Sequence, residues 1–390
     1  MLGPPPPADA TITARLRAAG AVILGKANMS EWATSISPRA GLSFSDVGGR
    51  LRNPYDGGDT SGSSNGSAIA AAASLAALTI GTETQGSIVL PSFINSAVGI
   101  KPTMGLVSRG GVIPLVPAFD QPGPIARSVT DAALLLSLIT GVDPRDPATR
   151  AQRGHVPAGG YERFLRRGAL RGARIGVPPA LARDPMGRVV GQRRIVSALR
   201  RLGATIVPIR GRLWVGTAPL EAIHGQFKRA VNRYLRERGP ASPRRSLSDV
   251  VAYNRRHGRE AVRYGQTFLV EAQAAGRRAQ RTAGRRLARY AARARRARDG
   301  PPPPRRDPRP APRRRGHRDL GRPPARDRPR RLRRADPVRD RPRRARLVGA
   351  AARRLRLRLR AGHPRLALPG RAEPGVRRRL PGGLSRRGPY

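Results

Sequence analysis

Cysteine is absent from the 390-residue sequence, which excludes disulfide bonds and thiolate metal sites. The longest apolar run, near residues 68–80, is too short and too rich in alanine to span a bilayer, which needs about 20 apolar residues. The first residues, Met1 to Gly3 followed by four prolines, have neither the basic region nor the apolar segment of a secretory signal. We therefore expect a cytoplasmic protein with no membrane partner, and no pattern in the sequence predicts a bound metal or cofactor.

Lysine is also scarce, because it accounts for only three of the 77 basic residues, Lys26, Lys101 and Lys228. The formal net charge is nevertheless +53, since arginine supplies almost all of the positive charge. A desolvated lysine can lose its proton whereas arginine cannot, so the few lysines could mark positions where that difference matters. The charge is uneven, because residues 1–150 hold 11 basic and 10 acidic side chains and the excess lies beyond them.

The composition changes near residue 299. Residues 299–390 are rich in arginine and proline and contain no Lys, Trp or Phe, so this tail cannot form a hydrophobic core. One interpretation is a disordered polycation that binds nucleic acid only non-specifically and with steep salt dependence. We favour the other interpretation, a frame-shifted product of G+C-rich DNA, and expect the tail to contribute nothing to the fold.

The informative stretch lies between residues 59 and 91, where two Gly/Ser loops flank an alanine-rich run. The first loop is Gly62-Ser63-Ser64-Asn65-Gly66 and continues to Ser67. Its glycines and asparagine tolerate left-handed or closely packed backbone, and its serines supply hydroxyls. The run at residues 67–78 has little side-chain bulk, which predicts a buried, tightly packed helix that fixes the two loops relative to each other.

The second loop, residues 81–87, ends in Gly86-Ser87. A hydroxyl at this position lies beside several main-chain N–H groups that no bulky side chain obstructs. Acyl transfer needs this combination, a nucleophile next to hydrogen-bond donors for the developing oxyanion. The pattern therefore favours Ser87 as a candidate nucleophile.

Together these loops resemble the amidase signature family. Its members share a G-S-S-G-G-S loop, an Ala/Gly-rich helix, a G-T-D-x-G-G-S-I-R-x-P segment and then G-x-K-P-T, which is matched here at residues 99–103. The resemblance implies that Ser87 is the acyl-forming nucleophile and that Ser63 is a bridging serine on a cis peptide bond. It implies an oxyanion hole made by the main-chain N–H groups of Thr84, Gln85, Gly86 and Ser87. It also implies a supporting loop made by Gly62, Ser64, Asn65 and Gly66.

The chain departs from the family pattern at three positions. Glu83 replaces Asp, Gln85 replaces Gly and Val89 replaces Arg. Glu83 and Val89 resemble variants of the peptide-amidase-like branch, which residues 246–254 and 264–266 resemble as well. Gln85 changes the surroundings of the implied oxyanion hole.

The third catalytic partner in the family is a lysine in a G-x-P-x-x-x-K-D-N segment, whose equivalent would precede Met1. We therefore expect this chain to lack the base and to be impaired as an enzyme. Lys26 lies in a different family segment, G-A-V-x-x-G-K-x-N, matched at residues 20–28. We interpret Lys26 as a structural lysine that braces the loops, and leave open that it is a replacement base.

The resemblance implies an α/β protein with the amidase-signature fold, a mixed central sheet with helices on both faces, incomplete at both ends. It covers residues 8–298, with a catalytic core at 20–140 and a helical, substrate-side region at 151–298. Local patterns predict an Asp9-capped helix to Ala18, a buried strand at 21–24, short strands at 98–101 and 106–108, a turn at 119–124 and a helix at 129–140. They also predict strands at 173–178 and 204–208 that flank a helix at 186–202 and pair in parallel, followed by a largely helical region at 217–298.

The leading hypothesis is an amidase that hydrolyses the C–N bond of a small-molecule or peptide carboxamide through a Ser-cisSer-Lys triad. One alternative is the glutaminase-type A subunit of a tRNA amidotransferase, which needs a partner subunit. The other is an inactive fragment whose basic tail binds nucleic acid non-specifically. The sequence leaves the oligomeric state open.

Overall fold

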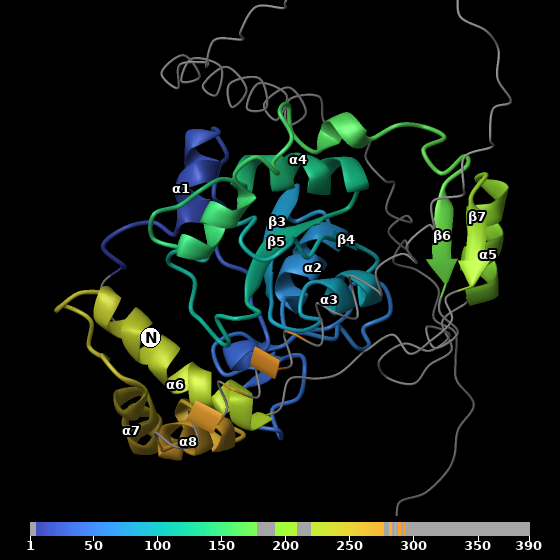
Figure 1. Ribbon diagram of the computed structural model, residues 1–390. Helices are drawn as coiled ribbons and strands as arrows, with labels where there is room; N and C mark the ends of the chain where they lie inside the picture. The colour runs from blue at the N-terminus through green and yellow to red at the C-terminus, as the bar shows by residue number, and fades with distance from the viewer. Residues whose placement is uncertain are drawn as a thin grey trace, which may run out of the picture.

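The computed structural model describes residues 5–177, 192–208 and 220–276, together with a few positions between 281 and 292. Figure 1 shows a central sheet with helices around it, a group of helices α6, α7 and α8 on one side, and a small unit of β6, α5 and β7 on the other. The tail at 299–390 and the predicted helical residues from 293 to 298 lie outside the described residues.

The central sheet is antiparallel and has the strand order β3-β5-β4. Its register pairs Leu78 with Ala126 at one end of β3 and Glu83 with Gln121 at the other. Every residue of β5 is buried, because this strand has a neighbour on each edge. The strands are β3 at Leu78–Glu83, β4 at Val98–Gly99 and β5 at Gln121–Ala126.

Helix α2, at Asn65–Ala72, covers one face of the sheet together with the start of α3 at Val89–Ile94. Ala68 and Ala71 of α2 are fully buried against Ile88 and Ile125. The same helix also passes close to the chain at Asn28, because a Cβ on Gly66 would lie 2.0 Å from the Asn28 carbonyl oxygen. The predicted tight packing of the alanine-rich helix is therefore confirmed.

Helices α1, at Thr11–Ala18, and α4, at Val129–Ile139, cover the opposite face. Side chains alternate along a strand, so Leu78 and Ile80 point away from α2 and join a cluster that contains Leu135 of α4. The α/β fold with helices on both faces of a sheet is thus confirmed. The predicted helix at 129–140 is also confirmed, and the Ser128 hydroxyl accepts a hydrogen bond from the Asp131 N–H at 3.1 Å to cap it.

The alanine-rich helix is shorter than the predicted range of 67–78. It ends at Ala72, and Ser74 then takes a left-handed conformation with φ of 61°. Residues 78–83 form β3 instead, because this segment is rich in β-branched residues and hydrogen-bonds along its length to β5. Tertiary pairing therefore overrides the helical tendency at the end of the run.

The predicted turn at 119–124 is wrong, because β5 begins at Gln121 and runs through Pro122 and Pro124. Proline is unusual in a central strand, since it cannot donate a hydrogen bond. The Ile100 N–H donates to the Pro124 carbonyl at 3.0 Å, so Pro124 faces the β4 edge, and Pro122 faces the same way two residues earlier. β4 is only two residues long and pairs with Ile125 and Ala126, so the hydrogen bonds between β4 and β5 do not require the N–H groups that the two prolines lack.

Two expectations for the N-terminal region are also wrong. Asp9 does not cap α1, because its carboxylate lies 2.9 Å from Nε of Arg17 and the N-cap position is Ala10. The predicted buried strand at 21–24 is absent, since this segment pairs with no strand among the described residues and leaves Val22 and Leu24 mostly exposed, at 78% and 74%. An apolar run by itself cannot form a strand without a hydrogen-bonding neighbour.

The helical group consists of α6 at Leu220–Glu237, α7 at Leu247–His257 and α8 at Thr267–Ala274, which agrees with the predicted helical region as far as it is described. Its core, which includes Phe227 and Leu235 of α6, also contains Ile36 and Phe44 from the segment before the first serine loop. This group therefore packs against the chain that leads into the loop. No helix in the described part of the chain is both long and apolar enough to cross a membrane.

The predicted parallel pairing near residues 173–208 is confirmed. β6 at Arg174–Val177 pairs in parallel with β7 at Thr205–Pro208, and α5 at Gln192–Arg201 connects to β7. The predicted helix residues 186–191 lie outside the described residues. Parallel and antiparallel pairings are thus both present, in separate sheets.

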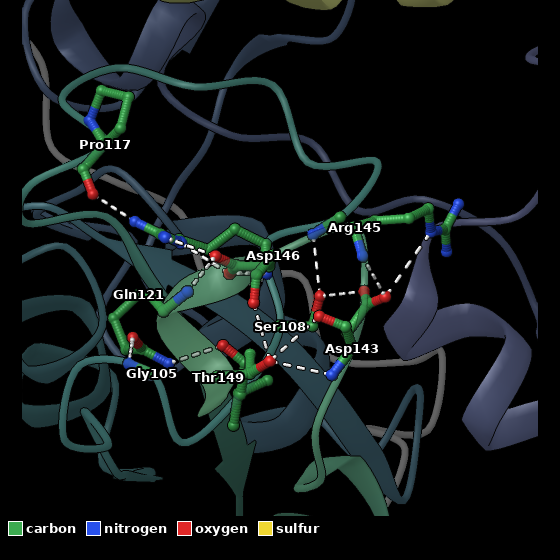
Figure 2. Close-up of polar contacts among 12 residues, drawn as sticks. Gly105, Ser108, Pro117, Gln121, Asp143, Arg145, Asp146 and Thr149 are labelled. Atoms are coloured by element: carbon green, nitrogen blue, oxygen red, sulfur yellow. Dashed lines mark hydrogen bonds and ion pairs between the residues drawn. The ribbon is translucent and has the colours of Figure 1, made fainter. Parts of the chain in front are cut away.

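Acidic side chains hold the loop after β4 against the chain that follows α4. Figure 2 shows Asp143 and Asp146 beside Ser108 and Thr149. Asp146 accepts two hydrogen bonds from the Arg109 guanidinium, at 2.6 and 2.8 Å, and a third from the Arg109 N–H at 3.0 Å. The Thr149 hydroxyl accepts from the Asp143 N–H at 2.8 Å. The loop is therefore fixed by a largely buried ion pair rather than by regular secondary structure.

We expect Asp146→Asn to lower the free energy of unfolding at neutral pH by about 2 kcal/mol, because the Arg109 guanidinium loses its charged partner. Burial alone would raise the pKa of Asp146, but the hydrogen bonds and charge of Arg109 hold it below its usual value. The ionised carboxylate therefore stabilises the fold above an unfolded pKa of about 3.9. This stability is lost as the pH falls through the lower folded pKa.

Urea denaturation between pH 3 and 7 measures this effect, and the variant should lose that part of the pH dependence. Asp9→Asn is the matched control, because its pair with Arg17 is exposed, at 43% and 60% of the two side chains, and is worth less than about 1 kcal/mol. Equal losses in the two variants would contradict the role assigned to Asp146.

Candidate active site

Ser63 lies near the start of the first loop, one residue before the N-cap Ser64 of α2, and the Gly62–Ser63 peptide bond is cis. Its side chain is fully buried, and its hydroxyl has no hydrogen-bond partner among the described residues. Gly62 is required here, because a Cβ would lie 2.4 Å from the Ser30 hydroxyl and 2.5 Å from the Leu42 carbonyl oxygen. A buried hydroxyl without a partner is rare in folded proteins and calls for a functional explanation.

Ser64 connects the two loops. Its N–H donates to the Ser87 carbonyl at 3.1 Å, while its hydroxyl donates to the Thr82 carbonyl and accepts from the Thr82 N–H, both at 3.0 Å. The main chain of Ser87 therefore contacts the residue that follows Ser63. The structure therefore brings the two serine loops into main-chain contact at Ser64 and Ser87, although the loops are far apart in the sequence.

Asn65 braces the first loop from inside. Its side-chain oxygen accepts from the Ser30 N–H at 3.2 Å, and its amide group donates to Leu42, Thr60 and Ser61. The Ser30 N–H also donates to the Ser63 carbonyl at 3.1 Å. This buried amide uses both of its ends, so it holds the loop in one conformation.

The second loop leaves β3 after Glu83 and enters α3 at Val89. The buried Glu83 carboxylate accepts hydrogen bonds from the N–H groups of Ile88 at 2.8 Å and Val89 at 3.1 Å, which closes the loop at its C-terminal end. Gly86 has a φ of 81°, and a Cβ there would lie 2.7 Å from the Leu90 side chain. The Glu83 substitution is thus compatible with a closed loop.

Within this loop, the N–H groups of Gln85, Gly86 and Ser87 make no hydrogen bond with any described residue. Ser87 is partly buried, whereas Gln85 is exposed. The replacement of glycine by Gln85 therefore places its side chain toward solvent. Free N–H groups that lead up to a serine form an arrangement that can bind an anionic oxygen.

Asp120 is a site residue that the sequence did not reveal. Its carboxylate accepts hydrogen bonds from the Thr84 hydroxyl at 2.6 Å and from the N–H groups of Leu115 at 2.8 Å and Val116 at 3.0 Å. Burial raises the pKa of Asp120, although these hydrogen bonds oppose the rise. In the sequence, Asp120 stood out only as an acidic residue within the segment 119–124, which we interpreted as a turn.

Lys26 takes part in none of these contacts. Its side chain is exposed, it lies in an irregular segment, and it makes no hydrogen bond or ion pair with a described residue. The strand predicted at 21–24, just before Lys26, is not formed among the described residues. Among the described residues, no cluster of His, Asp and Glu side chains is arranged to hold a metal ion.

The family model described as Amidase matches residues 1–290. The chain belongs to the amidase family. A protein named probable amidase from Arabidopsis thaliana is 42% identical over 276 residues, which are 68% of this chain and 52% of that protein. The A subunit of a glutamyl-tRNA(Gln) amidotransferase from Nocardia farcinica is 42% identical over 209 residues, which are 52% of this chain and 41% of the subunit.

Solved amidase structures have the same fold. The native peptide amidase from Stenotrophomonas maltophilia has a TM-score of 0.64 and 41% identity, over 71% of this chain and 58% of that one. An amidase family protein from Bacillus anthracis has a TM-score of 0.66 and 34% identity, over 74% and 59%. The chain spans about half the length of the curated relatives that it matches.

Replacing Glu83 by alanine should lower the free energy of unfolding by about 3 kcal/mol, because the Ile88 and Val89 N–H groups lose their acceptor. Both hydrogen bonds go to the same carboxylate oxygen, Oε2. Glu83→Gln keeps one such oxygen and is the matched control, with a smaller loss. Denaturant unfolding together with amide hydrogen exchange at residues 88 and 89 measures both effects, and unchanged exchange in the alanine variant would refute the assignment.

Proposed function

We propose that this chain carries the nucleophile and the oxyanion hole of an amidase that hydrolyses a small-molecule or peptide carboxamide. The observation that carries the proposal is the buried, unpartnered hydroxyl of Ser63, one residue away from the main-chain hydrogen bond that joins Ser64 to Ser87. The free Ser63 hydroxyl would pass a proton between Ser87 and the base, which is the role that the resemblance implies for the bridging serine. Family membership supports the same reaction class.

In the proposed reaction, the Ser87 hydroxyl oxygen attacks the carbonyl carbon of the amide. Its proton passes through the Ser63 hydroxyl to a neutral lysine, and the carbonyl oxygen becomes an oxyanion. The C–N bond then breaks, the proton returns to the leaving ammonia or amine, and an acyl-enzyme remains on Ser87. Water cleaves this ester by the same route, with the lysine as base again.

The oxyanion hole in this proposal consists of the main-chain N–H groups from Thr84 to Ser87. The absence of described partners for the N–H groups of residues 85 to 87 supports the assignment. Such donors lower the barrier only if they are already oriented, and removal of a single donor typically costs about 100-fold in rate or more. Asn65 and Glu83 would supply this rigidity from the two sides of the loops.

The lysine base is implied by the resemblance to lie in a G-x-P-x-x-x-K-D-N segment. Lys26 is the alternative base that the sequence itself offers. Its exposure speaks against this role, because a lysine acts as a base at neutral pH when it is desolvated. We therefore assign Lys26 no step in the reaction.

We also propose the division of labour along the chain. Residues 20–140 would hold the catalytic groups, and the helical region at 151–298 would contribute to the substrate side. The packing of α6 and its neighbours against Ile36 and Phe44, just before the first loop, supports this division. Cytoplasmic location remains a prediction from the sequence.

The second candidate function is the A subunit of a tRNA amidotransferase, and the identity to such subunits over about half of the chain favours it. That enzyme would need a partner subunit and would release ammonia from glutamine, whereas a peptide-type amidase would act alone on a simple amide. The third candidate, an inactive nucleic-acid binder, would show salt-sensitive binding to DNA of any sequence and no amide turnover.

Ser87→Ala should abolish amide turnover and covalent labelling by a fluorophosphonate probe, because the acyl-forming oxygen is gone. The measurement uses the chain itself and a version extended upstream to include a G-x-P-x-x-x-K-D-N segment. Ser63→Ala should retain weak labelling but lose about 100-fold in turnover or more, since a proton-transfer group is removed. Labelling that persists in Ser87→Ala would sink the nucleophile assignment.

Lys26→Arg in the extended version should retain most of the activity, because the exposed Lys26 side chain makes no hydrogen bond or ion pair with a described residue that arginine would disturb. Arginine cannot give up a proton at neutral pH, so a catalytic base at this position would not survive the change. Initial-rate assays of Lys26→Arg beside Lys26→Ala separate the two roles. If arginine were as damaging as alanine and the upstream lysine dispensable, Lys26 would be the base.

A further inference from the structure

The second loop, between β3 and α3 at residues 84–88 and called the Ser87 loop from here on, is held by a carboxylate at each of its ends. Glu83 binds the N–H groups at the C-terminal end, as described above, and Asp120 binds the Thr84 hydroxyl at the N-terminal end. Between these two carboxylates lie the N–H groups of Gln85, Gly86 and Ser87, which donate to no described residue. A loop anchored only at one end could rotate these N–H groups away from a common target.

The place of Asp120 follows from the sheet. Glu83 and Gln121 form the last residue pair between β3 and β5. Beyond this pair the strands separate, and Thr84 and Asp120 are the first residue on each side. The hydrogen bond of 2.6 Å between their side chains therefore continues the contact by one more position after the main-chain ladder has ended.

Asp120 also links the loop to the helical group. Its other hydrogen bonds hold the N–H groups of Leu115 and Val116, and Val116 is fully buried in contact with Ile223 of α6. Leu115 packs against both this cluster and the core of the helical group. One carboxylate thus connects the Ser87 loop with the layer that we assign to the substrate side.

A partly buried carboxylate loses hydration unless its lone pairs accept hydrogen bonds, and Asp120 has three donors. The charge of Arg109 favours the ionised form of Asp120, and Arg109 is itself paired with Asp146. Asparagine has the same shape, but its amide nitrogen would meet either the Leu115 N–H or the Thr84 hydroxyl as a second donor. The arrangement therefore requires an acid at this position rather than any polar side chain.

We propose that Asp120 is a positioning residue for acyl transfer. By holding the Thr84 hydroxyl, it orients the N–H groups of residues 85 to 87 toward the oxyanion, and it ties that orientation to the helical group. It does not touch the substrate. This inference rests on the proposed function, since it assigns a role in the same reaction.

The test compares Asp120→Asn, Thr84→Val and the double variant in the protein for which turnover and probe labelling are measured. Each single change should lower kcat by about 10- to 100-fold and leave KM within about threefold, because oriented donors act mainly on the transition state. The double variant should be no slower than the slower single variant, since both act through one hydrogen bond. Thr84→Ser, which keeps the hydroxyl, should restore kcat to within about threefold of the unmodified protein.

Asp131→Asn is the matched control, because Asp131 lies in the first turn of α4, where its carboxylate accepts a hydrogen bond from the capping hydroxyl of Ser128. It should lose stability and keep its kcat. Multiplied effects in the double variant, or a Thr84→Ser variant as slow as Thr84→Val, would overturn the inference.

Amide hydrogen exchange over residues 84–90 gives a reading that does not depend on activity. Asp120→Asn and Thr84→Val should both speed up exchange of this segment by about tenfold, and Asp131→Asn should not. An unmodified protein without turnover or labelling would refute the proposed function, and exchange alone would then decide the role of Asp120. Unchanged exchange in both variants would overturn the inference whatever the activity.

Discussion

Antiparallel hydrogen bonding between β3 and β5 determines where the Ser87 loop begins. The ladder ends at the pair of Glu83 and Gln121, and the chain on both sides then turns away from the sheet. A shift of this register by one residue would exchange the two faces of β3 and turn Gly81 away from Ser64, with which it is in close contact. The position of Ser87 relative to Ser63 therefore depends on the sheet, and the loops inherit their rigidity from it.

Unsatisfied hydrogen-bonding groups lie in the candidate site, and Oδ1 of Asn95 beside the first loop and Oε1 of Gln152 lack a described partner as well. Most buried polar groups near the two loops have several partners, as the contacts of Asn65, Ser64 and Glu83 show. Against this background, the Ser63 hydroxyl and the N–H groups of residues 85 to 87 lack described partners. Burial of an unpaired polar group costs free energy, so the fold retains the buried Ser63 hydroxyl at a cost that the proposed function would explain.

Sequence patterns predicted the parts of the structure that depend on local chemistry. The Gly/Ser loops, the close packing of the alanine-rich helix, the helix α4 and the parallel pair of β6 and β7 all followed from residue type and spacing. The errors occurred where a distant segment decides the outcome. The run at 21–24 found no neighbouring strand, and the two prolines of β5 entered a central strand because their edge needs no further donors.

The amino-acid sequence alone determined which residues could form the site, because small residues and glycines at Gly62, Gly66 and Gly86 are required by local backbone geometry and close contacts. Only the tertiary structure decided how the site is supported. Asp120 and Glu83 are ordinary acids in the sequence, and nothing in their neighbours shows what they bind. Glu83 binds N–H groups five and six positions along its own loop, whereas Asp120 meets the Thr84 hydroxyl, 36 positions away, because β3 and β5 pair. The partner of a carboxylate is set by distance in space, which the order of residues along the chain does not reveal.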